Sequence, residues 1–186
     1  MLPAPDPLQS RPVQARSDSA LELRKALGQF ATGVTVVTTR TADGSPVGLT
    51  VNSFTSVSLE PPLMLWCLGR DAASFDAFRL SERHLINVLA AEQLDIAKRF
   101  ATRAGDKFAG VQWSATDTGL PRLAGCTAWF ECAIRSRYEE GDHLILVGRI
   151  DSFEVVRGKP LIFHDSRFIA ELTEAPLPRG LRAPLG

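Results

Sequence analysis

The sequence predicts a mainly β domain, a closed or nearly closed antiparallel barrel with two or three peripheral helices. At least six short segments are rich in β-branched residues or alternate between apolar and polar positions, as β-strands do. Asp43-Gly44 and Gly141-Asp142 are typical hairpin turns between such segments. Helical segments do not separate the strands regularly, so a parallel sheet of repeated βαβ units is disfavoured. An antiparallel barrel accommodates these features best.

The first predicted element is a helix near the N-terminus. It begins with a capping box, in which Glu22 follows Ser19 by three positions. Its apolar residues Leu23, Leu27 and Phe30 recur at helical spacing. We therefore expect one face of this helix to pack against the domain.

Strands and two further helices follow in order. A β-branched run predicts a strand over 34–39, and its hairpin partner covers 47–51. Pro61-Pro62 is expected to end any ladder before a strand over 63–68, whose uninterrupted apolar run indicates burial on both faces. The remaining predicted elements are helices over 71–80 and 91–101, and strands over 84–89, 128–135, 144–150, 153–156 and 161–163.

Composition excludes several classes of partner. The chain has 21 Lys and Arg residues against 21 Asp and Glu residues, and it has no run of like charges, so neither nucleic acid nor a membrane is an expected partner. No apolar stretch approaches the roughly 20 residues that a membrane-spanning helix needs. Proline-rich segments predict flexible tails over 1–18 and 173–186, around one domain over 19–172. Because the first residues contain no apolar core of the signal-peptide type, we expect a cytoplasmic protein.

Cysteines and histidines give little support to a metal site, and we expect none. The cysteines lie in apolar runs and are expected to be reduced core residues: Cys67, Cys126 and Cys132. The histidines are far apart and lack metal-ligand spacing: His84, His143 and His164. His143 follows a turn and could reach a ligand, although an ordinary strand residue is the alternative. The other two lie in apolar runs and are expected to be structural.

Two polar features could bind a ligand. The segment 48–58 gathers hydroxyl and amide side chains that can satisfy phosphate oxygens, although a hydroxyl-rich strand and turn at the surface is the alternative. Arg99, on the polar side of the helix expected over 91–101, could anchor a phosphate or be solvated. The sequence contains neither a Rossmann glycine fingerprint nor a P-loop, and no residue pattern typical of hydrolytic catalysis.

Five sequence blocks together carry a family resemblance. They are LRKALGQFATGVTVVTT, GLTVNSFTSVSLEPPL, LINVLAAEQLDIAKRFA, DKFAGVQW and GDHLILVGRI. Their order and approximate spacing resemble those of the flavin reductase-like, FMN-binding split-barrel proteins, most of all the reductase components of two-component flavin-dependent monooxygenases. The resemblance covers roughly 21–168. It implies a split β-barrel, antiparallel and Greek-key-like, that forms a homodimer.

The resemblance also implies a set of site residues. Those expected along the flavin ring are Thr32, Gly33, Val34, Thr35, Val36 and Thr38. Those expected around its polar edge and the ribityl phosphate are Thr50, Val51, Asn52, Ser53 and Ser56, and those expected near the flavin tail are Arg99, Lys107 and Phe108. The nicotinamide site is expected to contain Gly141, Asp142, His143 and Phe168, with His143 as the catalytic residue.

The implied activity is hydride transfer from NADH or NADPH to FMN or FAD, with reduced flavin then passing by diffusion to a partner monooxygenase. Two alternatives remain open: a flavoprotein that keeps its flavin and acts on a small substrate, and a non-catalytic flavin-binding protein. Gly141-Asp142-His143 argues against mere storage. The chain departs from the family at Ser166, where a glycine is usual, and this changes the expected shape of the nicotinamide pocket.

Overall fold

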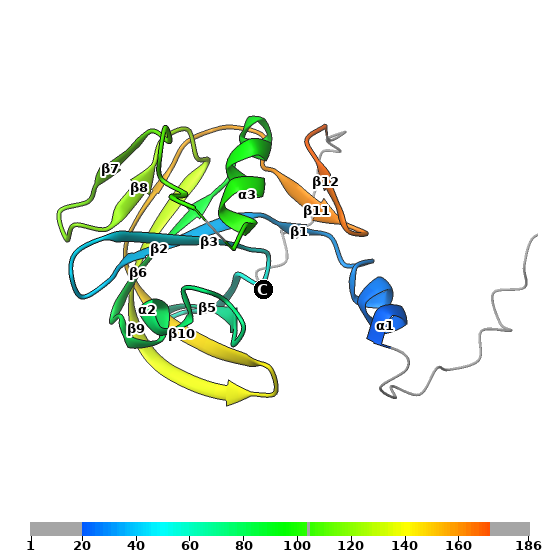
Figure 1. Cartoon of the computed structure of the whole chain (residues 1–186), viewed down its shortest axis with the longest axis horizontal. Helices are drawn as coiled ribbons and strands as arrows, with labels where there is room; N and C mark the ends of the chain where they lie inside the picture. The colour runs from blue at the N-terminus through cyan, green and yellow to red at the C-terminus, as the bar shows by residue number, and fades with distance from the viewer. Residues whose placement is uncertain (1–19, 104, 172–186) are drawn as a thin grey trace, which may run out of the picture.

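The computed structural model describes residues 20–103 and 105–171 (Figure 1). Both expected tails, over 1–18 and 173–186, and the capping residue Ser19 lie outside the described residues. The helical elements are α1 (Ala20–Leu27), α2 (Phe75–Leu80), the 3-10 turn η3 (Ala91–Gln93) and α3 (Leu94–Ala101). No helix among the described residues is long and apolar enough to cross a membrane.

Seven antiparallel strands form the main sheet, in the order β3-β2-β6-β9-β10-β5-β4. Their bounds are β2 Thr35–Arg40, β3 Pro46–Val51, β4 Thr55–Leu59, β5 Pro62–Gly69, β6 Arg83–Val88, β9 Ala128–Glu140 and β10 His143–Val155. A small sheet contains β1 (Thr32–Gly33), β11 (Ile162–His164) and β12 (Arg167–Ile169), and β7 (Trp113–Ala115) pairs with β8 (Pro121–Leu123). The mainly β, antiparallel architecture with peripheral helices is thus as expected.

The sheet is rolled rather than flat. Its two edge strands, β3 and β4, are consecutive in the chain and joined only by residues 52–54. Four residue steps from Val51 to Thr55 reach at most about 14 Å. Six strand spacings across a flat sheet would separate the same edges by about 29 Å. The edges must therefore approach each other where the chain crosses between them, which gives the barrel shape.

Apolar side chains pack on both faces of the rolled sheet, because neighbouring strand residues point to opposite sides. The inner core includes Val37, Met64, Trp66, Ile86 and Leu146, with Phe78 of α2 fully buried among them. An outer core covers the other face and includes Val36, Leu85, Phe100, Leu123 and Trp129. The segment from α3 to β8 thus becomes an outer layer, and this layer forms one side of the cleft described below.

Strand β5 corrects two expectations. Its residues Met64, Trp66 and Leu68 are fully buried, whereas the alternate residues Leu63, Leu65 and Cys67 are partly exposed, so it is not buried on both faces. Pro61-Pro62 also does not end the ladder, since Pro62 pairs with Leu59 and opens the β4–β5 hairpin. Proline is compatible with a strand at its first residue, which explains why the ladder begins there.

The C-terminal third is more continuous than expected. The segments 144–150 and 153–156 belong to one strand, β10, and the interruption is a register shift between Ile150 and Ser152. A bulge of this kind bends a strand without ending it. The short strands β7, β8 and β12 were not expected, because three-residue segments carry no detectable periodicity.

Helix α1 is the clearest difference from expectation. It lies to one side of the rolled sheet (Figure 1), and none of its residues is buried. Leu23 and Leu27 expose 47% and 66% of their surface, and Phe30 exposes 79%. The predicted apolar face exists, but it does not pack against the rest of the described chain.

Candidate functional site

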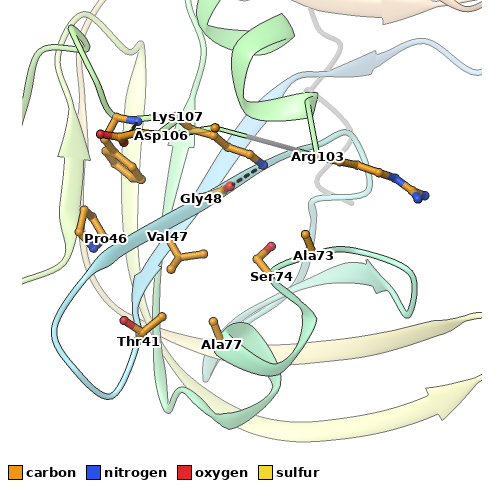
Figure 2. A pocket seen from close by; sticks show the side chains of 12 residues that line it. Thr41, Pro46, Val47, Gly48, Ala73, Ser74, Ala77, Arg103, Asp106 and Lys107 are labelled. Atoms are coloured by element: carbon orange, nitrogen blue, oxygen red, sulfur yellow. Dashed lines mark hydrogen bonds between the residues drawn. The ribbon is translucent and has the colours of Figure 1, made fainter.

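A cleft runs along strand β3, between it and two other segments. One part, with a volume of ≈ 300 Å³, lies beside Pro46, Val47 and Gly48, and an adjoining part of ≈ 170 Å³ lies beside Leu49 and Thr50. Both parts are lined by Ala73, Ser74, Arg103 and Lys107, so they form one continuous cleft. Figure 2 shows its wider part, with Ala73, Ser74 and Ala77 facing Val47 of β3.

Lys107 places a positive charge inside this cleft. Its Nζ donates to the backbone oxygens of Gly48, at 3.3 Å (Figure 2), and of Phe100, at 3.0 Å. Burial lowers the pKa of Lys107, because desolvation disfavours the ammonium form. Both partners are neutral carbonyls, and an ammonium has three N–H donors. The third donor can serve an anion in the cleft, whose charge would compensate the desolvation.

Gly48 permits this arrangement. A β-carbon at position 48 would lie 2.6 Å from Cε1 of Phe100, which is closer than two carbon atoms that are not bonded to each other approach in folded proteins. The absence of a side chain lets α3 lie close against β3, and this in turn brings the Phe100 oxygen within reach of Lys107. The glycine that opens the second of the five sequence blocks is thus required by packing.

At the rim of the cleft, Arg103 forms an ion pair with Asp71, which precedes α2. Both side chains are about three-quarters exposed, so the pair contributes little to stability. Asp106 also lines the cleft, and its Oδ1 accepts a hydrogen bond from the backbone N–H of Phe108 at 3.0 Å. The charges of Arg103 and Asp71 balance each other, which leaves Lys107 and Asp106 as the remaining charged groups.

Some side chains of the hydroxyl-rich segment, which begins within β3 and continues into β4, make structural hydrogen bonds. The Thr50 hydroxyl donates to the Ala97 oxygen at 2.7 Å. The Ser53 hydroxyl accepts from the backbone N–H of Cys67 at 2.9 Å and donates to the Cys67 oxygen at 3.3 Å. This pair continues the β4–β5 register by two residues beyond Thr55–Leu65, so the Ser53 side chain replaces a missing backbone partner of β5. Asn52 and Ser56 are exposed, and Val51 is half-buried.

Most side chains of the segment 32–38 are enclosed by protein. Val34 and Val36 belong to the outer core, Thr35 donates to the Val51 oxygen at 3.1 Å, and Thr38 donates to the Pro121 oxygen at 2.6 Å. Thr32 and Gly33 form β1 and are more accessible. The hydroxyl oxygen of Thr32 is itself buried and has no hydrogen-bond partner within the described residues.

The β9–β10 turn carries the Gly-Asp-His sequence. Gly141 has a φ of +56°, a conformation that glycine adopts readily. Nδ1 of His143 donates to the Asp142 carboxylate at 2.7 Å, and this hydrogen bond lowers the pKa of Asp142. The backbone N–H of Arg70 donates to the backbone oxygen of Asp142 at 3.0 Å, which attaches the turn to the end of β5.

Gly69 links this turn to the cleft. A β-carbon at position 69 would lie 3.7 Å from Nε2 of His143 and 3.1 Å from Oδ1 of Asp71. The His143 ring and the Asp71 carboxylate therefore both lie beside Gly69, where no side chain separates them. In this way the structure brings His143 close to the Arg103 end of the cleft, although the two are far apart in the sequence.

The structure does not bring the other expected tail and nicotinamide residues to one place. Phe108 lines the cleft and packs edge-on against Phe100, with ring centroids 5.0 Å apart. Arg99 is exposed on α3, where it donates to the Ala109 oxygen. Phe168 lies on β12 and packs against Phe163, with ring centroids 5.2 Å apart. Neither Arg99 nor Phe168 is among the residues that line the cleft.

Sequence reasoning missed Asp71, Ser74 and Arg103 as cleft residues. They come from two segments that flank helices, and neither segment contains a motif. Tertiary packing alone brings these segments together at the cleft.

The expectation of reduced core cysteines is confirmed for Cys126 and Cys132, whereas Cys67 is free but only partly buried. Cys67, Cys126 and Cys132 are free, and burial raises the pKa of the latter two to about 12, so they remain thiols. Within residues 20–103 and 105–171, no three His, Cys, Asp or Glu side chains are grouped so that they could hold a metal ion.

The rolled antiparallel sheet with peripheral helices defines a split-barrel protein, and a lysine-containing cleft runs along its strand β3. The chain belongs to the flavin reductase like domain family, whose model matches residues 27–170.

Known relatives support this membership. The chain is 47% identical to the "Probable flavin reductase" of Rhizobium meliloti over 71% of its own length and 42% of that protein. It is 40% identical to the flavin-dependent monooxygenase reductase subunit HsaB of Mycobacterium tuberculosis (strain H37Rv), over 76% of both chains. The chain spans about half the length of the first two relatives that it matches, 42% of one and 57% of the other.

Solved structures share the fold. The nitrilotriacetate monooxygenase component B homologue of Mycobacterium thermoresistibile is 34% identical, with a TM-score of 0.80 over 92% of this chain and 99% of that one. The NADH:FAD oxidoreductase SgcE6 of Streptomyces globisporus, solved with NAD and FAD fragments, is 36% identical, with a TM-score of 0.78 over 91% and 99% of the two chains.

Proposed function

We propose that this chain is an NAD(P)H:flavin oxidoreductase that supplies reduced flavin to a partner monooxygenase. The observation that carries the proposal is the cleft along β3, which contains a half-buried lysine with only neutral partners, in a chain that belongs to the flavin reductase family. Relatives named as reductase subunits of flavin-dependent monooxygenases support the role of the partner.

A flavin fits the residues present. The third N–H of Lys107 would hold a phosphate, because a charge-assisted hydrogen bond to an anion is the strong kind. Asn52 lies where the chain leaves β3 and Ser56 lies near the start of β4, and these exposed side chains would face the polar edge of the ring system. When bound, flavin supplies the hydride acceptor, so no acid or base in the chain is obligatory.

His143 would orient the nicotinamide. Because its Nδ1 donates to Asp142, the neutral imidazole has an unprotonated Nε2 that accepts a hydrogen bond. A carboxamide N–H is a suitable donor for that nitrogen. Fixing the nicotinamide in this way brings reacting groups together without chemistry at the histidine itself.

The decisive experiment is steady-state oxidation of NADH and of NADPH by the purified chain, with and without added FMN, FAD and riboflavin. We expect added flavin to stimulate the rate many-fold, because flavin is a substrate. A rate that does not change on flavin addition, in a protein that purifies with saturating flavin, would instead favour an enzyme that retains its cofactor.

We also propose that the chain acts as a homodimer. An eight-residue helix is marginal in water on its own, and the exposed apolar face of α1 would be covered by a second copy. Replacing Leu23 and Leu27 with Asp should therefore convert a dimer to a monomer in light scattering. A wild-type monomer at micromolar concentration with full activity would contradict this. A cytoplasmic location is part of the same proposal, supported by the free cysteines.

A further inference from the structure

The cleft continues well beyond Lys107, and this bears on which flavin it takes. Its narrow part lies beside Leu49 and Thr50, and its wide part, of ≈ 300 Å³, lies beside Pro46, Val47 and Gly48. Lys107 lines both parts, and so stands at their junction. Asn52 and Gly48 are four residues apart, which corresponds to a length of about 13 Å along an extended strand. A ring near Asn52 and a phosphate at Lys107 would use that length and leave the wide part free.

The wide part has the character of a site for a flat base. Its walls are mostly apolar and come from three segments: Pro46 and Val47 of β3, Ala73 and Ala77 at and before α2, and Phe108. Small side chains on the α2 side leave room opposite the strand, as Figure 2 shows. Ser74 and Arg103 line both parts, and the hydroxyl of Ser74 can supply a polar contact where the two parts meet.

The charges at the junction leave one cation for the phosphates. Lys107 is the half-buried cation, Arg103 is already paired with Asp71, and Asp106 adds a negative charge to the same wall. The terminal phosphate of FMN and the pyrophosphate of FAD each carry close to two negative charges at neutral pH, so charge does not separate the two flavins. The adenosine half of FAD does, because it would occupy the wide part of the cleft.

We infer that the chain selects FAD over FMN, and that the wide part of the cleft, between Val47 and Ala77, receives the adenylate half of FAD. This inference rests on the proposed function, because it assigns the second half of the same substrate. The same chemistry would let free ADP bind there alone, since ADP carries the base and the phosphates without the flavin ring.

Direct binding tests the inference without relying on activity. Calorimetry on the full chain with FAD, FMN, riboflavin and ADP is expected to give an FAD Kd at least tenfold below that of FMN. ADP should bind and should compete with FAD, but not with riboflavin. Ala77→Phe, which fills the wide part, should weaken FAD at least tenfold more than FMN. Leu80→Phe, on the exposed side of the same helix, is the matched control and should leave the FAD-to-FMN ratio unchanged.

The outcomes separate the two claims. Equal affinities for FAD and FMN, or no binding of ADP, would overturn the inference while flavin reduction by the chain stands. Failure to bind or reduce any flavin would overturn the proposed function as well. The competition by ADP is measured on the wild-type chain, so it decides the question even if Ala77→Phe does not fold.

Discussion

Replacing Lys107 with Met tests the cleft most directly, because Met keeps the length of the side chain and removes its charge. Lys107 has two neutral hydrogen-bond partners, and we expect its third donor to meet the flavin phosphate. A hydrogen bond between charged groups contributes about 1.5–3 kcal/mol, so FMN and FAD should bind about ten- to a hundredfold more weakly. Riboflavin, which lacks the phosphate, should bind almost as before.

Fluorescence titration of each flavin measures this, with Lys98→Met on the exposed face of α3 as the matched control. The pH dependence provides a second test. The folded-state pKa of Lys107 lies below its ordinary value, so the ammonium is lost at a lower pH than in an exposed lysine. Wild-type affinity for FMN should therefore fall with rising pH sooner than an exposed lysine would cause, and the affinity of Lys107→Met should not fall in this way. Equal weakening of riboflavin and FMN would show that the side chain acts on the fold or on the ring, and would refute the phosphate assignment.

Three further predictions follow from the hydrogen bonds and burial described above. His143→Ala should slow the reduction of bound flavin, or raise the KM for NAD(P)H, about tenfold, which corresponds to roughly 1.4 kcal/mol. Flavin affinity should be retained. Stopped-flow kinetics that match those of the wild type at every NADH concentration would exclude a role of His143 in nucleotide binding. Ser53→Ala should lower the free energy of unfolding by about 1–3 kcal/mol, because the backbone N–H of Cys67 loses its hydrogen-bond partner. Denaturant titration measures this change. An unchanged midpoint of the unfolding curve would show that the hydrogen bond contributes nothing to stability. His84 is buried, and its pKa is lowered from 6.5 to about 3, so the unfolded chain binds a proton that the folded chain does not. Stability should fall as the pH drops from 6.5 toward 3, by up to about 1.4 kcal/mol per pH unit from this group, and His84→Phe should flatten that slope in acid-unfolding curves.

Local signals predicted the strands well, and the turns best of all. Asp43-Gly44 and Gly141-Asp142 each join the two strands expected to pair, because a positive φ at glycine is a strictly local requirement. Whether a face of a strand is buried depends less on the local sequence. The apolar run of β5 is uninterrupted in the sequence, yet its outer residues remain partly exposed in the described chain, since burial depends on what covers them.

The candidate site was harder to predict for the same reason. Thr38 and Thr50 cannot be told apart as hydroxyl residues in the sequence. Thr38 is fully buried and donates to the Pro121 oxygen, whereas Thr50 lines the cleft. Whether a hydroxyl meets a ligand or a carbonyl is decided by partners some 50 to 80 positions away. Asp71 and Arg103 join the site only through an ion pair across 32 positions, which no spacing rule contains.

The crossing at 52–54 has a consequence for the order of folding. It joins the two edges of a sheet whose middle strands lie as far along the chain as residue 155. The edges can approach only after β5 has paired with β10, a contact that closes a loop of roughly 80 residues and is slow to form. The end of the cleft that faces Asn52 is therefore completed late in folding, and it opens early when the sheet begins to come apart. A ligand held there would report on the closure of the whole sheet, so its release on heating or in denaturant should precede the loss of strand signal.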